Sequence, residues 1–409
     1  MPTEPNRSPS TILLTRLLII LVIFGIGWNY WLPTAEDYFN LQTREGYPPN
    51  IDFFAYYNAG NRFEEGANPY YWAETNPAEG NFSDFIYPPA ILPLLKTLSS
   101  LPYNNARSLW AGLYGTLLLL ALITMQQLLP EKNRWLYILF SSFLFLTSFP
   151  LLLHIRNGQM DAAMISMILL SLVLYQRQKV LPAAILLAAA AVVKVSPGFL
   201  LIYYLIYHRD LRFTAYFLVS AALFVSISLL WVPFSLYIDF AQNILPEVSR
   251  GTSYWLNQSI VKLLPEGHGL ASLISLLGLS SLSIYAWFRS QPASSDTRKN
   301  NTSSLSMEET LFFYLNLLVI LAFAGKIWSM AYVWMILPSA FLLTKLVHSS
   351  NSLRHLIFPS VCILLMNSKV YGYPLLNSLN LLGNLLMTGF VIWELHNLSS
   401  KLSIEQSNP

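Results

Sequence analysis

The chain is built from blocks of apolar residues long enough to cross a lipid bilayer, and this feature excludes most soluble folds. Of its 409 residues, 54% are hydrophobic and only 11% are charged, whereas a soluble domain carries about a quarter charged residues. A stretch of roughly 17–25 apolar residues spans the hydrocarbon core as a helix. The sequence therefore predicts an all-α fold, a polytopic transmembrane helical bundle.

Twelve apolar segments are predicted, and together they make a single integral membrane domain over residues 1–409. Short segments must tilt, thin the bilayer or form a hairpin that lines a cavity. Residues 17–35 are uncharged and no small-residue cleavage site follows them, which favours an uncleaved anchor over a signal peptide. The segments are 12–32, 106–129, 135–153, 160–175, 181–193, 196–207, 213–233, 269–288, 309–323, 328–346, 355–371 and 375–396.

The charges of the short connections orient the bundle. Short cytoplasmic loops carry an excess of Lys and Arg, so both termini are predicted to be cytoplasmic. The long loops 33–105 and 234–268 are then outside, and the Ser- and Asn-rich segment 289–306 is a flexible cytoplasmic linker. The connections that carry the basic residues are 130–134, 176–179, 208–212, 289–306 and 347–354.

The first long loop carries the densest group of polar residues on the predicted outside face. Its segment Asn50–Gly60 predicts a short helix that begins near Asp52, with Asp52 and Tyr56 on one face at i, i+4 spacing. One interpretation of Asp52 is an N-cap that satisfies free backbone amides. The other is a general base that accepts the proton of an acceptor hydroxyl. The local sequence leaves both open.

Cations occur at several breaks between apolar segments. Lys194 stands between two half-length segments, three residues before Pro197. A lysine at such a break lines a cavity or contacts an anion, unless its ammonium simply reaches the membrane interface. Lys326 and Lys369 occupy equivalent positions, and Arg156 lies in a polar turn that is also consistent with an ordinary outside loop.

Aromatic and amide side chains on the outside face suggest sugar binding without establishing it. Tyr87 begins a Pro-rich amphipathic segment that either anchors at the interface or guides a lipid tail. Asn257 and Gln258 follow two aromatic residues, an arrangement that suits sugar rings and interfacial anchoring equally well.

Metal, disulfide and nucleic-acid chemistry receive no support from the sequence. The six histidines form no cluster with metal-ligand spacing, so no metal is predicted. The single cysteine, Cys362, lies in an apolar run and is interpreted as core or lipid-facing filler. A net charge of +3 is too small to indicate a nucleic-acid partner.

Several motifs together resemble glycosyltransferase family 87, the polyprenol-phosphate-mannose-dependent mannosyltransferase-like family of glycosyltransferase superfamily C. The first-loop segments Asp52–Gly60 and Gly66–Tyr70 are similar to the first-loop signature of this family. Later landmarks follow in the same order, from about residue 50 to 260. They are Tyr87–Pro89, Asn157–Gln159, Lys194–Pro197 and Asn257–Ser259. One departure is Asp161, which stands where many relatives carry Asn, so the resemblance leaves its role open.

The resemblance implies a multi-pass enzyme of the cell membrane that uses a polyprenyl-phosphate sugar as donor substrate, with no cofactor. Such an enzyme moves a hexose such as mannose to a glycan or glycolipid acceptor at the outer face, surrounded by membrane lipids. Asp52 matches the acidic first-loop residue that acts as the catalytic base. The available cations for the donor phosphate are Lys194, Arg156, Lys326 and Lys369. The residues predicted to bind substrate are Tyr56, Tyr57, Tyr87, Gln159, Asn257 and Gln258.

Two other functions stay open at this point. A transporter or flippase of a lipid-linked or amphiphilic solute would also use polar groups at helix breaks, but it needs them along a path between both faces. A non-catalytic assembly partner with the same fold would tolerate the loss of Asp52, which a transferase would not.

The predicted orientation is tested by cysteine labelling at Ser83 and Ser295, one in the first long loop and one in the linker 289–306. In intact cells, an impermeant thiol reagent should modify Ser83→Cys and spare Ser295→Cys. Labelling of Ser295→Cys alone would invert the predicted orientation.

Overall fold

The computed structural model describes residues 9–30, 51–71, 84–249, 256–264, 270–289, 305–349, 353–369 and 378–407. Most of the predicted linker 289–306, parts of both long loops, and the labelling positions Ser83 and Ser295 lie outside these ranges. The described residues form helices and no strand, with a single isolated bridge between Asn257 and Trp328. The predicted all-α class is therefore confirmed.

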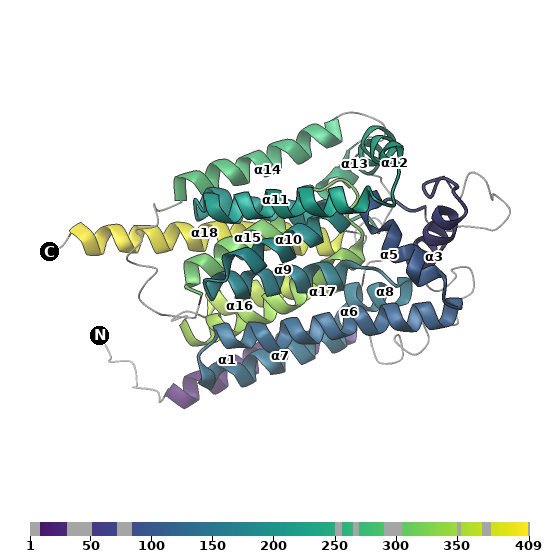
Figure 1. Ribbon diagram of the computed structural model, residues 1–409. Coiled ribbons are helices and arrows are strands. Elements are labelled where there is room, and N and C mark those ends of the chain that lie inside the picture. The colour runs from purple at the N-terminus through teal and green to yellow at the C-terminus, as the bar shows by residue number, and fades with distance from the viewer. Residues whose placement is uncertain are drawn as a thin grey trace, which may run out of the picture.

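The long helices run alongside one another as a bundle, as Figure 1 shows. Several short helices, α3, α5, α8, α12 and α13, gather at one end, which we call the short-helix end. At the opposite end α1 begins and α18 ends. The helices are α1 (Pro9–Tyr30), α3 (Ile51–Glu64), α5 (Leu92–Ser99), α6 (Tyr103–Met125), α7 (Arg134–Thr147), α8 (Phe149–Asn157), α9 (Asp161–Gln176), α10 (Val180–Val193), α11 (Leu211–Ser228), α12 (Phe234–Asp239), α13 (Leu245–Ser249), α14 (Leu270–Arg289), α15 (Met307–Phe323), α16 (Ile336–Ser349), α17 (Arg354–Asn367) and α18 (Leu379–Ser407).

Four of the described helices are long and apolar enough to cross a membrane. They are Tyr103–Leu128, Leu211–Ser228, Leu270–Arg289 and Ser329–His348. A further pair, Glu131–Thr147 with Phe149–Asn157, is bent by 62° and raises the number to five if it counts as one span. The predicted twelve spans are not confirmed, because many apolar segments form helices of fewer than 18 residues.

The long apolar helices divide into a central one and peripheral ones. The apolar window of Ser329–His348 is 94% buried within the protein, against 17–22% for the other three. The three peripheral helices therefore turn large apolar side chains such as Leu119, Leu223 and Leu276 outward. Apolar side chains on the outside of a bundle are favourable where the surroundings are lipid tails rather than water. This arrangement supports a membrane-embedded bundle.

The predicted cytoplasmic connections contact one another at the end opposite the short helices. Arg177 donates to the side chain of Gln127, and Arg289 pairs with Glu308 at 3.1 Å. The Arg209 guanidinium lies 4.5 Å from the ring centre of Trp287. The basic connections therefore share one end of the bundle, as the sequence predicts, and which compartment this end faces stays a prediction.

The first-loop helix α3 includes the predicted segment that begins near Asp52, and it packs closely on α5. A Cβ atom built on Gly60 would lie 2.3 Å from the Leu95 carbonyl oxygen and 2.7 Å from Ser99 Oγ. A side chain at this position would push the two backbones apart. Glycine at position 60 therefore allows α3 to reach α5.

We expect Gly60→Ala to lower stability, because overpacking a close contact costs about 1–3 kcal/mol. Gly115→Ala is the matched control, since a Cβ at Gly115 meets nothing within 4 Å. In a helix interior Ala is more stable than Gly by roughly 0.5–1 kcal/mol. The apparent melting temperatures of the detergent-purified variants should therefore fall for Gly60→Ala and stay or rise for Gly115→Ala. Equal melting temperatures would show that the close contact contributes nothing.

Candidate functional site

A left-handed turn between α8 and α9 is the surface on which α3 docks. Gly158 ends α8 with φ 68° and ψ 34°, and its carbonyl oxygen accepts a hydrogen bond from Trp110 Nε1 at 2.9 Å. A Cβ at Gly158 would lie 2.6 Å from the Cβ of Phe53. Glycine at this position therefore supplies both the positive φ and the room that Phe53 needs. Asp52, the neighbour of Phe53, is thereby placed at the α8–α9 turn.

Asp52 is half-buried and lies among amides and charges from other elements. Burial raises the pKa of its carboxyl to about 7, and the negative charge of Asp161 adds to this rise. Hydrogen bonds from the side chains of Gln159 and Asn157 and the positive charge of Lys194 oppose it. A carboxylate that titrates near neutral pH is suited to accept and release a proton.

Gln159 is fixed in place by two tyrosines. The hydroxyls of Tyr56 and Tyr87 donate to Gln159 Oε1 at 3.1 and 3.2 Å, and Tyr56 Oη lies 3.0 Å from Tyr87 Oη. Burial raises the pKa of both hydroxyls well above the ordinary value, so they stay protonated donors. Because both donate to the oxygen of Gln159, its NH₂ group is left to face Asp52.

A buried ion pair stands beside Asp52. Lys194 Nζ donates to Asp161 Oδ1 at 2.7 Å, and Trp334 Nε1 donates to the same oxygen at 2.9 Å. Lys194 follows α10 and precedes the turn of 3₁₀ helix Ser196–Leu200 that contains Pro197, so the predicted break is present. Asp52, Gln159, Asp161 and Lys194, which are far apart in the chain, therefore form one group that we call the Asp52 cluster.

Two residues at this site, Asp161 and Trp334, are absent from the predicted site residues. The sequence predicts Asp161 on the outside face as a departure from the family pattern and leaves its role open. Trp334 lies in the predicted span 328–346, where an apolar run gives no sign that its indole NH meets a carboxylate. The departure from the family pattern could have indicated Asp161. Only the fold reveals Trp334.

The other predicted cations and Tyr57 occupy different surroundings. Lys326 pairs with Glu247 at 3.2 Å, and Tyr57 donates to the Leu101 carbonyl oxygen at 2.8 Å. Arg156 lies in the last turn of α8, next to Asn157, and Lys369 follows the end of α17. The charge of Lys194 acts on Asp52. Donor binding by any of the four stays a prediction.

Asn257 and Gln258 are fully buried and bind backbone groups. Asn257 Oδ1 accepts from the amide of Ile327 at 3.1 Å, and Gln258 Oε1 accepts from the amide of Leu381 at 3.3 Å. These bonds fasten the second long loop to the segment after α15 and to the start of α18. A sugar contact for the two amides stays a prediction, and the interaction they make here is structural.

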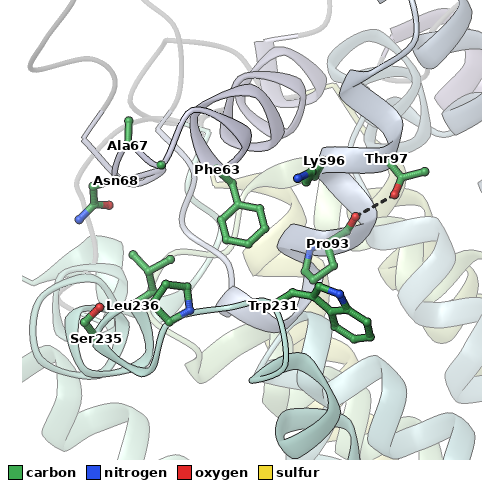
Figure 2. Close-up of a pocket in the computed structure, with 11 residues that line it drawn as sticks. Phe63, Ala67, Asn68, Pro93, Lys96, Thr97, Trp231, Ser235 and Leu236 are labelled. Carbon is green, nitrogen blue, oxygen red and sulfur yellow. Dashed lines mark hydrogen bonds between the residues drawn. The ribbon is translucent and has the colours of Figure 1, made fainter.

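A cavity of about 800 Å³ lies at the short-helix end, away from the Asp52 cluster. It is lined by the end of α3, by α5 and by residues that follow α11, among them Phe63, Lys96 and Trp231 (Figure 2). Phe63 stands eleven residues after Asp52 on the same helix, about 16 Å along its axis. Asp52, Gln159, Asp161 and Lys194 do not line this cavity.

Among the described residues, no group of three or more His, Cys, Asp or Glu side chains could hold a metal ion. Metal-independence itself stays a prediction. The cluster supplies instead one carboxyl group of near-neutral pKa and one ammonium.

Comparison with known proteins matches the central part of the chain to the model of one family. No curated protein matches the chain. The family model of glycosyltransferase family 87 matches residues 85–266, a range that includes Tyr87, Gln159, Lys194 and Asn257, while Asp52 precedes it. The match confirms the resemblance to glycosyltransferase family 87 over these residues, and that family is one of membrane glycosyltransferases.

Proposed function

We propose that the protein transfers a hexose from a polyprenyl-phosphate sugar to an acceptor hydroxyl at the outer face of the cell membrane, with inversion and with Asp52 as general base. One observation carries the proposal: a half-buried carboxyl group with a pKa of about 7 stands beside the ammonium of Lys194. The first group can take a proton, and the second can face a phosphate.

The proposed reaction needs one base and one cation. Asp52 accepts the proton of the acceptor hydroxyl while the hydroxyl oxygen attacks C1 of the donor sugar. The bond between C1 and the phosphate oxygen breaks, its electron pair stays on the phosphate, and the configuration at C1 inverts. A fixed cation that faces the departing phosphate stabilises the negative charge that develops there. Lys194, with 20% of its side chain exposed, is placed to do so.

The geometry favours transfer over transport. The Asp52 cluster is confined to the short-helix end, and the basic connections are at the opposite end. A transport path requires polar groups from one face to the other, whereas the centre of the described bundle is packed with apolar side chains such as Leu318, Leu342 and Phe341. The positive-inside rule then supports an outer location for the cluster.

We expect Asp52→Asn to lower turnover at least about a hundredfold, because Asn cannot accept the acceptor's proton. In the parent protein, kcat/KM should fall about tenfold per pH unit below the Asp52 pKa of about 7. Transfer from a radiolabelled polyprenyl-phosphate sugar, followed against pH in detergent-purified protein, measures both effects.

Turnover of Asp52→Asn separates the base from a helix cap, because Asn caps a helix about as well as Asp, and the stability of the variant is the accompanying control. The pKa of Asp52 is raised from 3.8 in the unfolded chain to about 7 in the folded protein. The folded state therefore binds the extra proton between these values, and stability falls as pH rises through this window. At pH 8 Asp52→Asn removes a half-buried charge, so its melting temperature should equal or exceed that of the parent. Normal turnover in a well-folded Asp52→Asn protein would contradict the assignment.

We expect Lys194→Met to lower kcat/KM for the donor at least about tenfold, because the variant keeps the apolar stem and removes the charge that faces the phosphate. The matched control is Lys96→Met, which removes an exposed cation paired with Glu64 at the same end of the bundle. Surface pairs of that kind contribute about 0–1 kcal/mol, so the control should retain activity. Unchanged donor kinetics in Lys194→Met would leave Lys194 without a role in donor binding.

A further inference from the structure

Asp161 is a buried carboxylate with two donors on one of its oxygens. It is the first residue of α9 and only 1% exposed. Its Oδ1 accepts from Lys194 at 2.7 Å and from Trp334 Nε1 at 2.9 Å, donors that come from two other elements. The start of a helix also favours negative charge. A buried charge is tolerated when it is paired and hydrogen-bonded in this way.

The ion pair is open on one side only. The Lys194 side chain is 20% exposed, whereas the Asp161 side chain is 2% exposed. A ligand can therefore reach the ammonium while the carboxylate stays behind it. The Lys194 Nζ also lies 5.9 Å from the ring centre of Tyr87, a member of the hydrogen-bond network around Gln159. Asp161 therefore lies behind Lys194 as seen from a ligand.

Both members of the pair also act on Asp52. The groups packed around the site are Tyr56 of α3, Tyr87 before α5, His154 and Asn157 of α8, Gln159, Asp161, Lys194 and Trp334. Among these, the charges that act on the Asp52 carboxyl are those of Asp161 and Lys194, and they act in opposite directions. Asp161 disfavours the ionised form of Asp52, and Lys194 favours it.

The geometry points to Asp161 as a positioning residue that holds the Lys194 ammonium in the site and, together with it, sets the charge that Asp52 faces. This assignment rests on the proposed function. It gives a role to the aspartate whose role the family resemblance left open. Burial raises the pKa of Asp52 to about 7, and the opposite charges of Asp161 and Lys194 adjust it in opposite directions.

The decisive test follows the titration of Asp52 without any donor present. Infrared difference spectra of detergent-purified protein report the protonation of carboxyl groups, and the Asp52 band is identified by its loss in Asp52→Asn. Asp161→Asn keeps the shape of the side chain and its ability to accept from Trp334. We expect it to move the Asp52 midpoint to lower pH, and Lys194→Met to move it to higher pH. The double variant should return the midpoint toward the parent value.

A matched control and an activity measurement complete the test. Asp239→Asn changes an aspartate of α12 that accepts hydrogen bonds from Asn68, Tyr71 and Asn243 outside the cluster, so it should leave the Asp52 midpoint in place. At pH 8.5, where Asp52 is ionised, Asp161→Asn should still lower kcat/KM about tenfold to a hundredfold, because Lys194 is no longer held.

The outcomes separate the inference from the proposed function. A parent protein without transferase activity would overturn the function, while the donor-free titration would still test the effect of the ion pair on Asp52. A transferase whose Asp52 midpoint is the same in Asp161→Asn, Lys194→Met and the parent would overturn the inference alone. Should Asp161→Asn fold poorly, the double variant removes both charges together and provides the comparison with Lys194→Met.

Discussion

The docking of α3 on the α8–α9 turn is the contact on which the site depends. Gly158 has a positive φ and lies so close to Phe53 that any side chain would prevent the approach. Together with the packing of α3 on α5, this contact brings a loop helix that precedes the matched range 85–266 to residues more than a hundred positions later in the chain. There Asp52 has the burial and the neighbours that bring its pKa to about 7.

Charge balance in the Asp52 cluster is the second constraint. Two carboxylates and one ammonium share a region with little water, where an unpaired charge is costly. The short contact between Lys194 and Asp161 neutralises one carboxylate, and the other, Asp52, carries the raised pKa. Such an arrangement leaves Asp52 able to exchange protons near neutral pH.

Many other buried polar side chains form hydrogen bonds with backbone groups. Asn380 Nδ2 donates to the carbonyl oxygens of Leu365, Met366 and Ser368, which end α17, and its Oδ1 accepts from Ser329 at 2.5 Å. Helix ends leave carbonyl groups without a partner, and within a membrane such groups must be satisfied by the protein itself. Asn257 and Gln258 also bind backbone groups, because their side-chain oxygens accept from the amides of Ile327 and Leu381. A polar residue at a helix break therefore does not by itself indicate substrate binding.

The sequence by itself indicated the membrane class, the all-α fold, the basic end of the bundle and the resemblance to a family, because hydrophobic blocks and short motifs are local properties of the chain. It also identified Asp52, Gln159 and Lys194 as functional candidates. It could not count the spans, since apolar length does not distinguish a crossing helix from a short buried one. Only the tertiary structure joined Asp161 to Lys194 and Trp334, brought that pair beside Asp52 and gave Asn257 backbone partners. These are contacts between residues distant in the chain, and the packing of helices decides them.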